Sequence, residues 1–280
     1  MKSYPGEEVH LPFNPVHYVN FGGKFSINAL ISPNTNEERR GTDPEVRSLE
    51  GECPDIITKE EFENILRKEA DRIPLEIESE RMSFAAMEWI YDKICKAEGL
   101  GIFPHPYWLC PTMNVSENYT RFIYEQKPFD AFEVLGGENY FSHNGFQTGL
   151  YYEMKAKGYD YPVVGSTDSH NPTENNRNSQ ICSTIVFAKD NTTKDLIEAI
   201  KAKRSIAVDT ISAEYRLVGD FRLMKYASFL MENWYPIHDR ACKGEGYYMH
   251  AFGDGQDGAE DILKAIKGTV PGMFVKYFAI

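Results

Sequence analysis

The sequence contains no apolar run near the roughly 20 residues that a membrane-spanning helix needs. Its first residues, MKSYPGEEVH, lack the apolar core of a secretory signal. Cysteine is scarce, and the 5 cysteines are scattered, odd in number and without a Cys-x-x-Cys pair. They are Cys53, Cys95, Cys110, Cys182 and Cys242. We therefore expect a cytoplasmic protein with reduced thiols and no membrane contact.

Basic residues are also under-represented, with 30 Lys and Arg against 42 Asp and Glu, which gives a formal net charge of −12. A surface that binds long nucleic acids needs clustered basic residues to neutralise phosphates. The charge therefore argues against such a partner and leaves a small substrate, or one bound end of a polymer. Hydrophobic residues make up 42% of the 280 positions, enough to bury the core of one large domain or two small ones.

Short apolar segments alternate with amphipathic ones through most of the chain. Because strands that alternate with helices of ten or more residues pair in parallel, we expect an α/β fold with a doubly wound sheet or a barrel. The expected strands cover residues 6–10, 16–23, 101–105, 130–135, 161–166, 183–188 and 205–209. The expected helices cover residues 59–70, 83–99, 115–127, 145–158, 192–203, 215–234 and 259–268. Thr58 and Glu61 form a predicted capping box, and Ser83 is the predicted cap of the next helix.

Imidazole and carboxylate groups stand at the ends of several predicted strands. Glu8 and His10 end the first strand, His17 begins the second, and His105 ends the strand 101–105. Glu133 lies near the end of another, and Asp168 and His170 follow the strand in VVGSTDSH. In parallel α/β folds functional groups collect at the carboxyl ends of strands, and this ligand mixture suits zinc, manganese or iron. Alternatively, Asp168 caps a polar turn and each histidine fills a structural position.

These motifs resemble the PHP family, the polymerase and histidinol phosphatase domain of metal-dependent phosphoesterases. The resemblance covers residues 4–170 and is carried by Gly6-Glu7-Glu8-Val9, by His17, by His105-Pro106, by Glu133 and by Gly165-Ser166-Thr167-Asp168-Ser169-His170. It implies a distorted TIM-like (β/α)7 barrel over residues 1–209, incomplete at its N-terminus. A helical extension, residues 210–280, would pack on it. The implied activity is hydrolysis of a phosphate ester on a small substrate by a metal-activated water.

The resemblance also implies roles for individual residues. Glu8 would bridge two of one to three divalent metal ions, and His17 and His105 would complete the first. Asp168 would bind the second ion and His170 the third, and these two residues are the implied catalytic groups. His10, Glu133 and Arg177 are predicted to contact substrate, with Arg177 gripping its phosphate. A solvated loop arginine is the alternative for Arg177.

The sequence departs from the family pattern ahead of Glu8. Members of the family carry a His-x-His strand before the Gly-x-Glu strand, and the seven residues that precede Glu8 contain no histidine. The resemblance then implies that the first metal keeps its protein ligands and that a barrel edge stays unpaired, which would favour a homo-oligomer. Two other functions stay open: a catalytically impaired metal-binding or structural remnant, and a metal-dependent hydrolase of C–N bonds.

Overall fold

The computed structural model describes residues 2–32, 55–108, 115–136, 141–168, 182–209 and 216–278, except for the side chains of residues 141 and 142. The chain divides into two compact units, Met1–Asp220 and Phe221–Ile280. Each unit is described by itself. The predicted boundary after residue 209 lies ahead of the last strand of the first unit, and the assignment of residues 1–209 and 210–280 as domains stays a prediction.

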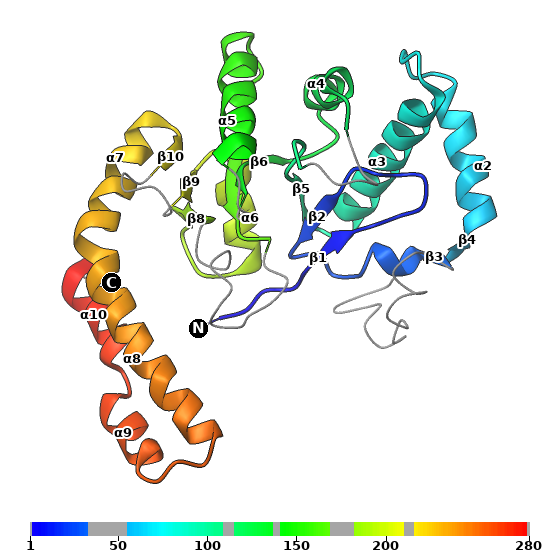
Figure 1. The fold of residues 1–280 in the computed structure, drawn as a ribbon. Helices are drawn as coiled ribbons and strands as arrows, with labels where there is room; N and C mark the ends of the chain where they lie inside the picture. Colours follow the sequence, from blue (N-terminus) through cyan, green and yellow to red (C-terminus); the bar gives the residue numbers. More distant parts are fainter. Residues whose placement is uncertain are drawn as a thin grey trace. The chain divides into compact units, whose positions relative to one another are not determined.

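The first unit is a mixed α/β structure built around a five-stranded sheet (Figure 1). Its strands, in spatial order, are β1 (Gly6–Val9), β2 (Tyr18–Phe21), β5 (Leu100–Phe103), β6 (Ala131–Gly136) and β7 (Val163–Ser166). β5, β6 and β7 run parallel, as the alternation of strands and helices predicts. β1 and β2 form an antiparallel pair, and β2 is antiparallel to β5. Only eight residues connect β1 and β2, too few for the crossover that parallel pairing needs, so the short connection accounts for their antiparallel pairing.

Two smaller sheets complete the strands of the first unit. β8 (Cys182–Val186), β9 (Ser205–Asp209) and β10 (Arg216–Gly219) form an antiparallel sheet in the order β10-β9-β8. The parallel pairing expected for strands that alternate with helices is therefore wrong for β8 and β9, which pair antiparallel although a helix lies between them in the sequence. β3 (Ile31–Ser32) pairs in parallel with β4 (Ile57–Thr58). Among the strands that the structure describes, no closed barrel is found. The coarser prediction of an α/β fold is confirmed, and a TIM-like barrel is not shown.

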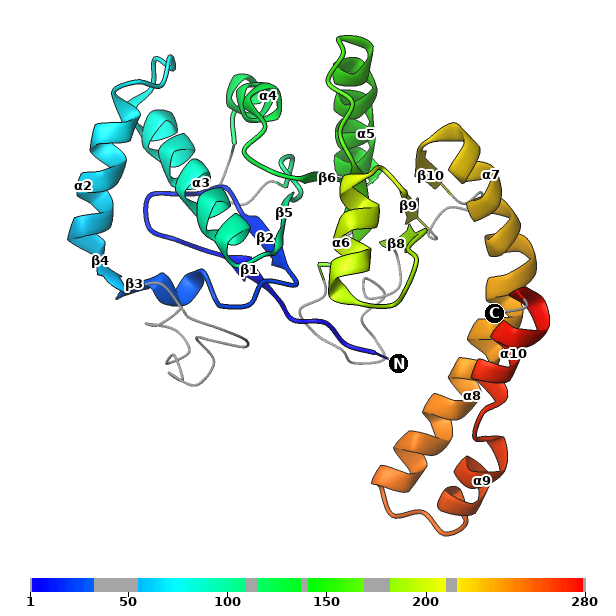
Figure 2. The same cartoon turned by 180° about the vertical axis from the view of Figure 1, so that it is seen from behind.

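Helices follow the strands and pack against the sheet through apolar side chains. In the first unit they are α2 (Lys59–Ala70), α3 (Glu78–Lys96), α4 (Glu117–Gln126), α5 (Phe141–Ala156) and α6 (Thr193–Lys201). Seen from both sides, α2 and α3 lie side by side (Figures 1 and 2). Phe103, Tyr124 and Phe132 are fully buried, and the Phe132 ring lies 5.8 Å from Phe103 and 5.1 Å from Tyr124. These contacts form the part of the core between the end of β5, the start of β6 and α4.

Two predicted helix boundaries differ from the observed ones. Ser83 does not cap a helix, because α3 begins five residues earlier at Glu78. Its hydroxyl instead donates to Asn14 Oδ1 at 2.9 Å and accepts from Tyr119 at 2.7 Å. The predicted helix 215–234 begins with strand β10, because pairing with β9 outweighs the helical periodicity of this segment.

The second unit is helical. It contains α7 (Phe221–Phe229), a π-helical segment (Leu230–Trp234), α8 (Tyr235–Gly253), α9 (Ala259–Ile266) and α10 (Thr269–Phe278). The Trp234 ring lies 4.9 Å from Phe274 and 4.8 Å from Phe278, so α10 packs on the start of α8. None of the described helices combines the length and the apolar character needed to cross a bilayer.

The capping box at the start of α2 gives a first test of the local structure. Thr58 Oγ1 accepts from the Glu61 amide at 3.1 Å, and Glu61 accepts from the Thr58 amide at 2.8 Å. We expect Thr58→Ala to lower the free energy of unfolding by about 1 kcal/mol. Urea titration monitored by Trp89, whose ring lies 5.0 Å from Phe62 of α2, measures this change. Thr58→Ser keeps the acceptor, so an equal loss in both variants would contradict the capping role.

Candidate metal centre

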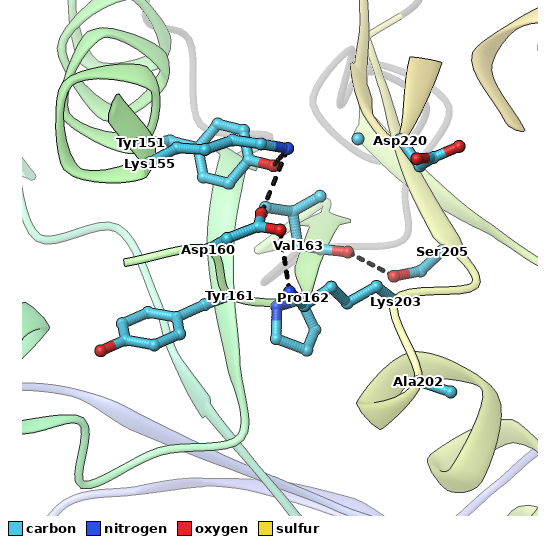
Figure 3. Close-up of a pocket in the computed structure, with 11 residues that line it drawn as sticks. Tyr151, Lys155, Asp160, Tyr161, Pro162, Val163, Ala202, Lys203, Ser205 and Asp220 are labelled. Atoms are coloured by element: carbon cyan, nitrogen blue, oxygen red, sulfur yellow. Dashed lines mark hydrogen bonds and ion pairs between the residues drawn. The ribbon is translucent and has the colours of Figure 1, made fainter. Parts of the chain in front are cut away.

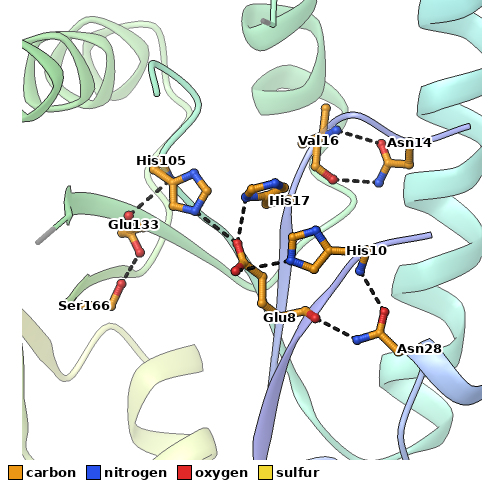
Figure 4. Close-up of polar contacts among 9 residues, drawn as sticks. All are labelled: Glu8, His10, Asn14, Val16, His17, Asn28, His105, Glu133 and Ser166. Carbon is orange, nitrogen blue, oxygen red and sulfur yellow. Dashed lines mark hydrogen bonds and ion pairs between the residues drawn. The ribbon is translucent and has the colours of Figure 1, made fainter. Parts of the chain in front are cut away.

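The antiparallel pair β1–β2 brings three candidate residues to one end of the sheet. Glu8 lies on β1, opposite Val19 of β2. His10 follows β1 directly, and His17 immediately precedes β2. His105 comes two residues after β5, which pairs with the other side of β2. Residues separated by up to 97 positions therefore meet at this end of the sheet (Figure 4).

The Glu8 carboxylate is the centre of this cluster. Its Oε1 lies 2.8 Å from His17 Nδ1 and 3.2 Å from His105 Nε2. Its Oε2 lies 3.3 Å from His10 Nε2. The rings of His10 and His17 are 4.4 Å apart, and those of His17 and His105 are 5.0 Å apart. Three imidazoles thus surround one carboxylate, as Figure 4 shows.

Burial and charge shift the pKa values in this cluster. Burial alone would raise the pKa of Glu8, but hydrogen bonds with His10, His105 and His17 hold it far below its usual range. Burial acts against protonation of His105, yet its hydrogen bond to Glu8 and the charges of Glu133, Glu8 and Asp168 raise its pKa to about 9. Without a metal ion, His105 is therefore a cation at neutral pH.

Glu133 forms a second, deeper part of the site on β6. Its carboxylate accepts a hydrogen bond from the His105 amide at 3.1 Å and another from the Ser166 hydroxyl. Burial raises the pKa of Glu133 to about 7, although His105 and Ser166 lower it. Asp168 raises the pKa values of both His105 and Glu133 through its charge, which places this carboxylate within electrostatic range of the cluster. Near neutral pH Glu133 can hold or release a proton beside His105.

An apolar wall limits the access of water to two of the imidazoles. The Trp108 ring lies 5.3 Å from His17 and 5.8 Å from His105. The side chains of His17 and His105 are only 10% and 13% exposed. His17 Nε2 is buried and has no hydrogen-bond partner among the residues that the structure describes. This ring therefore has a nitrogen available to bind an ion, and a low dielectric would strengthen that contact.

The geometry fits a divalent metal ion. Glu8, His17 and His105 each offer a ligand atom, and these atoms all lie within 4.8 Å of one another. Ligand atoms roughly 2.0–2.2 Å from a tetrahedral zinc ion are about 3.3–3.6 Å apart. The 3.2 Å between Glu8 Oε1 and His105 Nε2 is close to this spacing, and the 2.8 Å between Oε1 and His17 Nδ1 is shorter. Two imidazoles and one carboxylate also form a ligand set used by catalytic zinc, which keeps its fourth position open. His10 lies on the other carboxylate oxygen of Glu8, outside this group of three.

The remaining predicted site residues are placed less completely. Asp168 follows β7 by two residues and is half-buried, with φ +48°. His170 and Arg177 lie outside the described residues, so the roles predicted for them stay predictions. The catalytic assignment of Asp168 stays a prediction too, as do the substrate contacts of His10 and Glu133.

Sequence reasoning missed several groups that support the cluster. The Glu7 carboxylate accepts five hydrogen bonds, from the side chains of Asn20, Ser26 and Asn28 and from the amides of Ile27 and Asn28. Asn28 also donates to the Glu8 carbonyl at 2.7 Å and accepts from the His10 amide at 2.8 Å. Glu7 therefore anchors the strand that carries Glu8. The only indication of this role in the sequence was the position of Glu7 next to Glu8 in Gly6-Glu7-Glu8.

Two aromatic residues near the cluster also gave no sequence signal. Trp108 comes three residues after His105, and its amide donates to the His105 carbonyl at 3.0 Å, so a tight turn positions the indole. His143 fits no ligand spacing, yet burial and the charge of His105 lower its pKa. A turn after His105 places Trp108, and a position on α5 places His143. Neither feature produces a motif in the sequence.

Comparisons with known proteins add little to this description. No family model matches the chain, and no curated protein matches it. Among solved structures, the chain is similar to a Bacteroides vulgatus protein described as a "two-domain protein containing predicted PHP-like metal-dependent phosphoesterase", with 15% identity and a TM-score of 0.37. The match covers 72% of this chain and 43% of that one, so the chain spans less than half of its length. At this level of similarity the match does not assign a family.

Proposed function

We propose that this chain is a metal-dependent hydrolase of the PHP type that cleaves a phosphate ester on a small substrate. The observation that carries the proposal is the convergence of His17 and His105 on one oxygen of Glu8, at 2.8 and 3.2 Å. The order of motifs from Gly6 to His170 supports the assignment. A distorted TIM-like barrel, one to three zinc, manganese or iron ions and further ligation by Asp168 and His170 belong to the same proposal.

The residues of the chain would share the chemistry as follows. A divalent ion held by Glu8, His17 and His105 would act as a Lewis acid and acidify a bound water. Trp108 restricts water around the two imidazoles, which strengthens electrostatic contacts with a charged substrate. Glu133, with a pKa raised to about 7 by burial, is suited to hold a proton taken up during hydrolysis. His10 and Arg177 would contact the substrate.

One observation favours the structural alternative. Glu8 is satisfied by three imidazoles without an ion, so the cluster can also serve as a buried ion-pair network that holds β1 to β5.

Elemental analysis of protein purified without added metal separates the two functions, and phosphatase assays with manganese and zinc follow it. We expect at least one bound ion per chain and a turnover that requires His105. If neither a bound ion nor this turnover were found, the cluster would serve only as an ion-pair network. Amide substrates in the same panel test the hydrolysis of C–N bonds.

The raised pKa of His105 predicts that metal binding releases a proton. A ligating imidazole must be neutral, and the pKa of His105 in the metal-free protein is about 9. We expect zinc affinity to rise about tenfold per pH unit between pH 7 and 9 and to level off above that range. Calorimetric titration of EDTA-treated protein, in two buffers with different ionisation enthalpies, counts the protons released. An affinity that stays constant over this range would contradict ligation by His105.

The raised pKa of His105 also predicts how the stability of the metal-free protein depends on pH. Protonated His105 is favoured in the folded state because its pKa rises from 6.5 to about 9. Its contribution to stability is therefore fully present below pH 6.5 and is lost as the pH rises through about 9. Saturating zinc should remove this pH dependence, since the ion replaces the proton. A cytoplasmic location and self-association through a sheet edge stay predictions.

A further inference from the structure

A cavity of about 220 Å³ lies at the amino ends of β7 and β9, in the first unit (Figure 3). Because β5, β6 and β7 run parallel, this is the edge of the sheet opposite to the one that follows β5 and carries His105. The polar side chains of its lining include Tyr151, Lys155, Asp160, Lys203, Ser205 and Asp220. None of them belongs to the candidate metal centre.

Positive and negative groups alternate around this cavity. The Asp160 carboxylate lies between two lysines, with Oδ1 3.1 Å from Lys155 Nζ and Oδ2 2.8 Å from Lys203 Nζ. Lys155 also donates to the Tyr151 hydroxyl at 3.1 Å. Figure 3 shows this chain of contacts along one wall. The two lysines are balanced by Asp160 and Asp220, so the lining has no net formal charge.

This balance argues against a charged ligand. The ends of α5 and α6, at Ala156 and Lys201, add carbonyl dipoles that disfavour an anion. The two ammonium groups disfavour a cation. A zwitterion would need an ammonium group to receive its negative charge, whereas Lys155 and Lys203 both pair with Asp160.

The lining can still both donate and accept hydrogen bonds. The Tyr151 hydroxyl accepts from Lys155, which leaves its own proton to donate. Ser205 donates to the Val163 carbonyl at 2.8 Å, which leaves its oxygen to accept. Each ammonium carries three N–H groups, and the carboxylate oxygens of Asp160 have further lone pairs. Pro162, Val163 and Ala202 add apolar surface beside these groups.

We propose that this cavity binds a small neutral polyhydroxyl compound, a monosaccharide or cyclic polyol. Every hydroxyl of such a ligand both donates and accepts, which matches the alternating lining, and its C–H faces match the apolar surface. The volume of about 220 Å³ suits a single ring, since it is below that of pockets for larger ligands. This inference does not depend on the proposed phosphoesterase activity, because the cavity shares no residue with the metal centre.

Saturation-transfer NMR and calorimetry on the full chain in EDTA test the proposal, with glucose, ribose, myo-inositol, inorganic phosphate and glycine as probes. We expect at least one of the three polyols to bind with a Kd between about 0.1 and 10 mM and neither phosphate nor glycine to match it. Lys155→Met should weaken binding about tenfold, because it removes a donor and keeps the length of the side chain.

Lys157→Met is the matched control. Lys157 lies one residue beyond the end of α5 and pairs with Glu153 at 2.7 Å, outside the cavity, so its loss should change the Kd less than twofold. Melting temperatures of both variants establish that each is folded. Equal weakening by both substitutions, tighter binding of phosphate or glycine, or no polyol binding at 50 mM would overturn the proposal.

Discussion

Replacing Glu8 with glutamine is expected to lower zinc affinity at least 100-fold and to abolish metal-dependent turnover. The amide has nearly the shape of the carboxylate but lacks the negative charge that both His17 and His105 contact through one oxygen. A loss of this size corresponds to about 3 kcal/mol of binding free energy. The pKa of His105 should also fall, since its hydrogen bond to Glu8 is the largest contribution that raises it. Zinc calorimetry and NMR titration of the imidazole measure the two effects.

The second unit supplies a matched control for this substitution. His250 Nδ1 lies 2.9 Å from Asp254 Oδ2, and the side chains are 80% and 54% exposed. Asp254→Asn therefore removes a carboxylate from a histidine that water surrounds, and zinc affinity should stay within twofold of the unchanged protein. If Glu8→Gln also left zinc affinity unchanged, Glu8 would not be a ligand and the metal centre would be wrong.

Replacing Glu7 with alanine is expected to lower the free energy of unfolding by about 4 kcal/mol. Five donors lose their acceptor, and Asn20, Ile27 and Asn28 are buried with at most 8% exposure. A buried donor left without a partner costs about 1–3 kcal/mol, and some of these donors will reach water after local rearrangement. Urea titration monitored by Trp89 and Trp108, the tryptophans of the first unit, measures the loss.

Glu63→Ala is the control for Glu7→Ala, because Glu63 is a glutamate that pairs on the surface. Glu63 lies 2.6 Å from Arg67 on α2, and the arginine is 56% exposed, so its removal should cost less than about 0.5 kcal/mol. Glu7→Ala should also weaken zinc binding, because Asn28 joins the Glu7 carboxylate to the Glu8 carbonyl. If Glu7→Ala had the stability of the unchanged protein, the five hydrogen bonds to Glu7 would make no net contribution to folding.

Local patterns in the sequence predicted the elements of the fold better than their pairing. The capping box at Thr58 is confirmed, as is the alternation of strands and helices around β5, β6 and β7. The strand β10 was missed, because its four residues carry no pattern that excludes a helix and pairing with β9 stabilises it. Ser83 was misplaced for a similar reason: its partners, Asn14 and Tyr119, are distant in sequence.

The candidate ligands could be named from the sequence because they stand next to strand ends. Glu8, His17 and His105 adjoin β1, β2 and β5, and the structure brings them within ligand distance. Their environment could not be derived in this way. The raised pKa of Glu133 depends on complete burial beneath His105 and Ser166, and the wall formed by Trp108 depends on one turn of the backbone.

The position of Glu8 on an outer strand has a consequence for dynamics. Within the described five-stranded sheet, β1 is a terminal strand of four residues and pairs with β2 alone. Such strands open locally at a lower free energy than the centre of a sheet. Each opening would carry the carboxylate away from the imidazole that follows β5. Cation occupancy and amide hydrogen exchange along this strand would then be thermodynamically linked, and tighter binding would appear as slower exchange at an edge that otherwise frays.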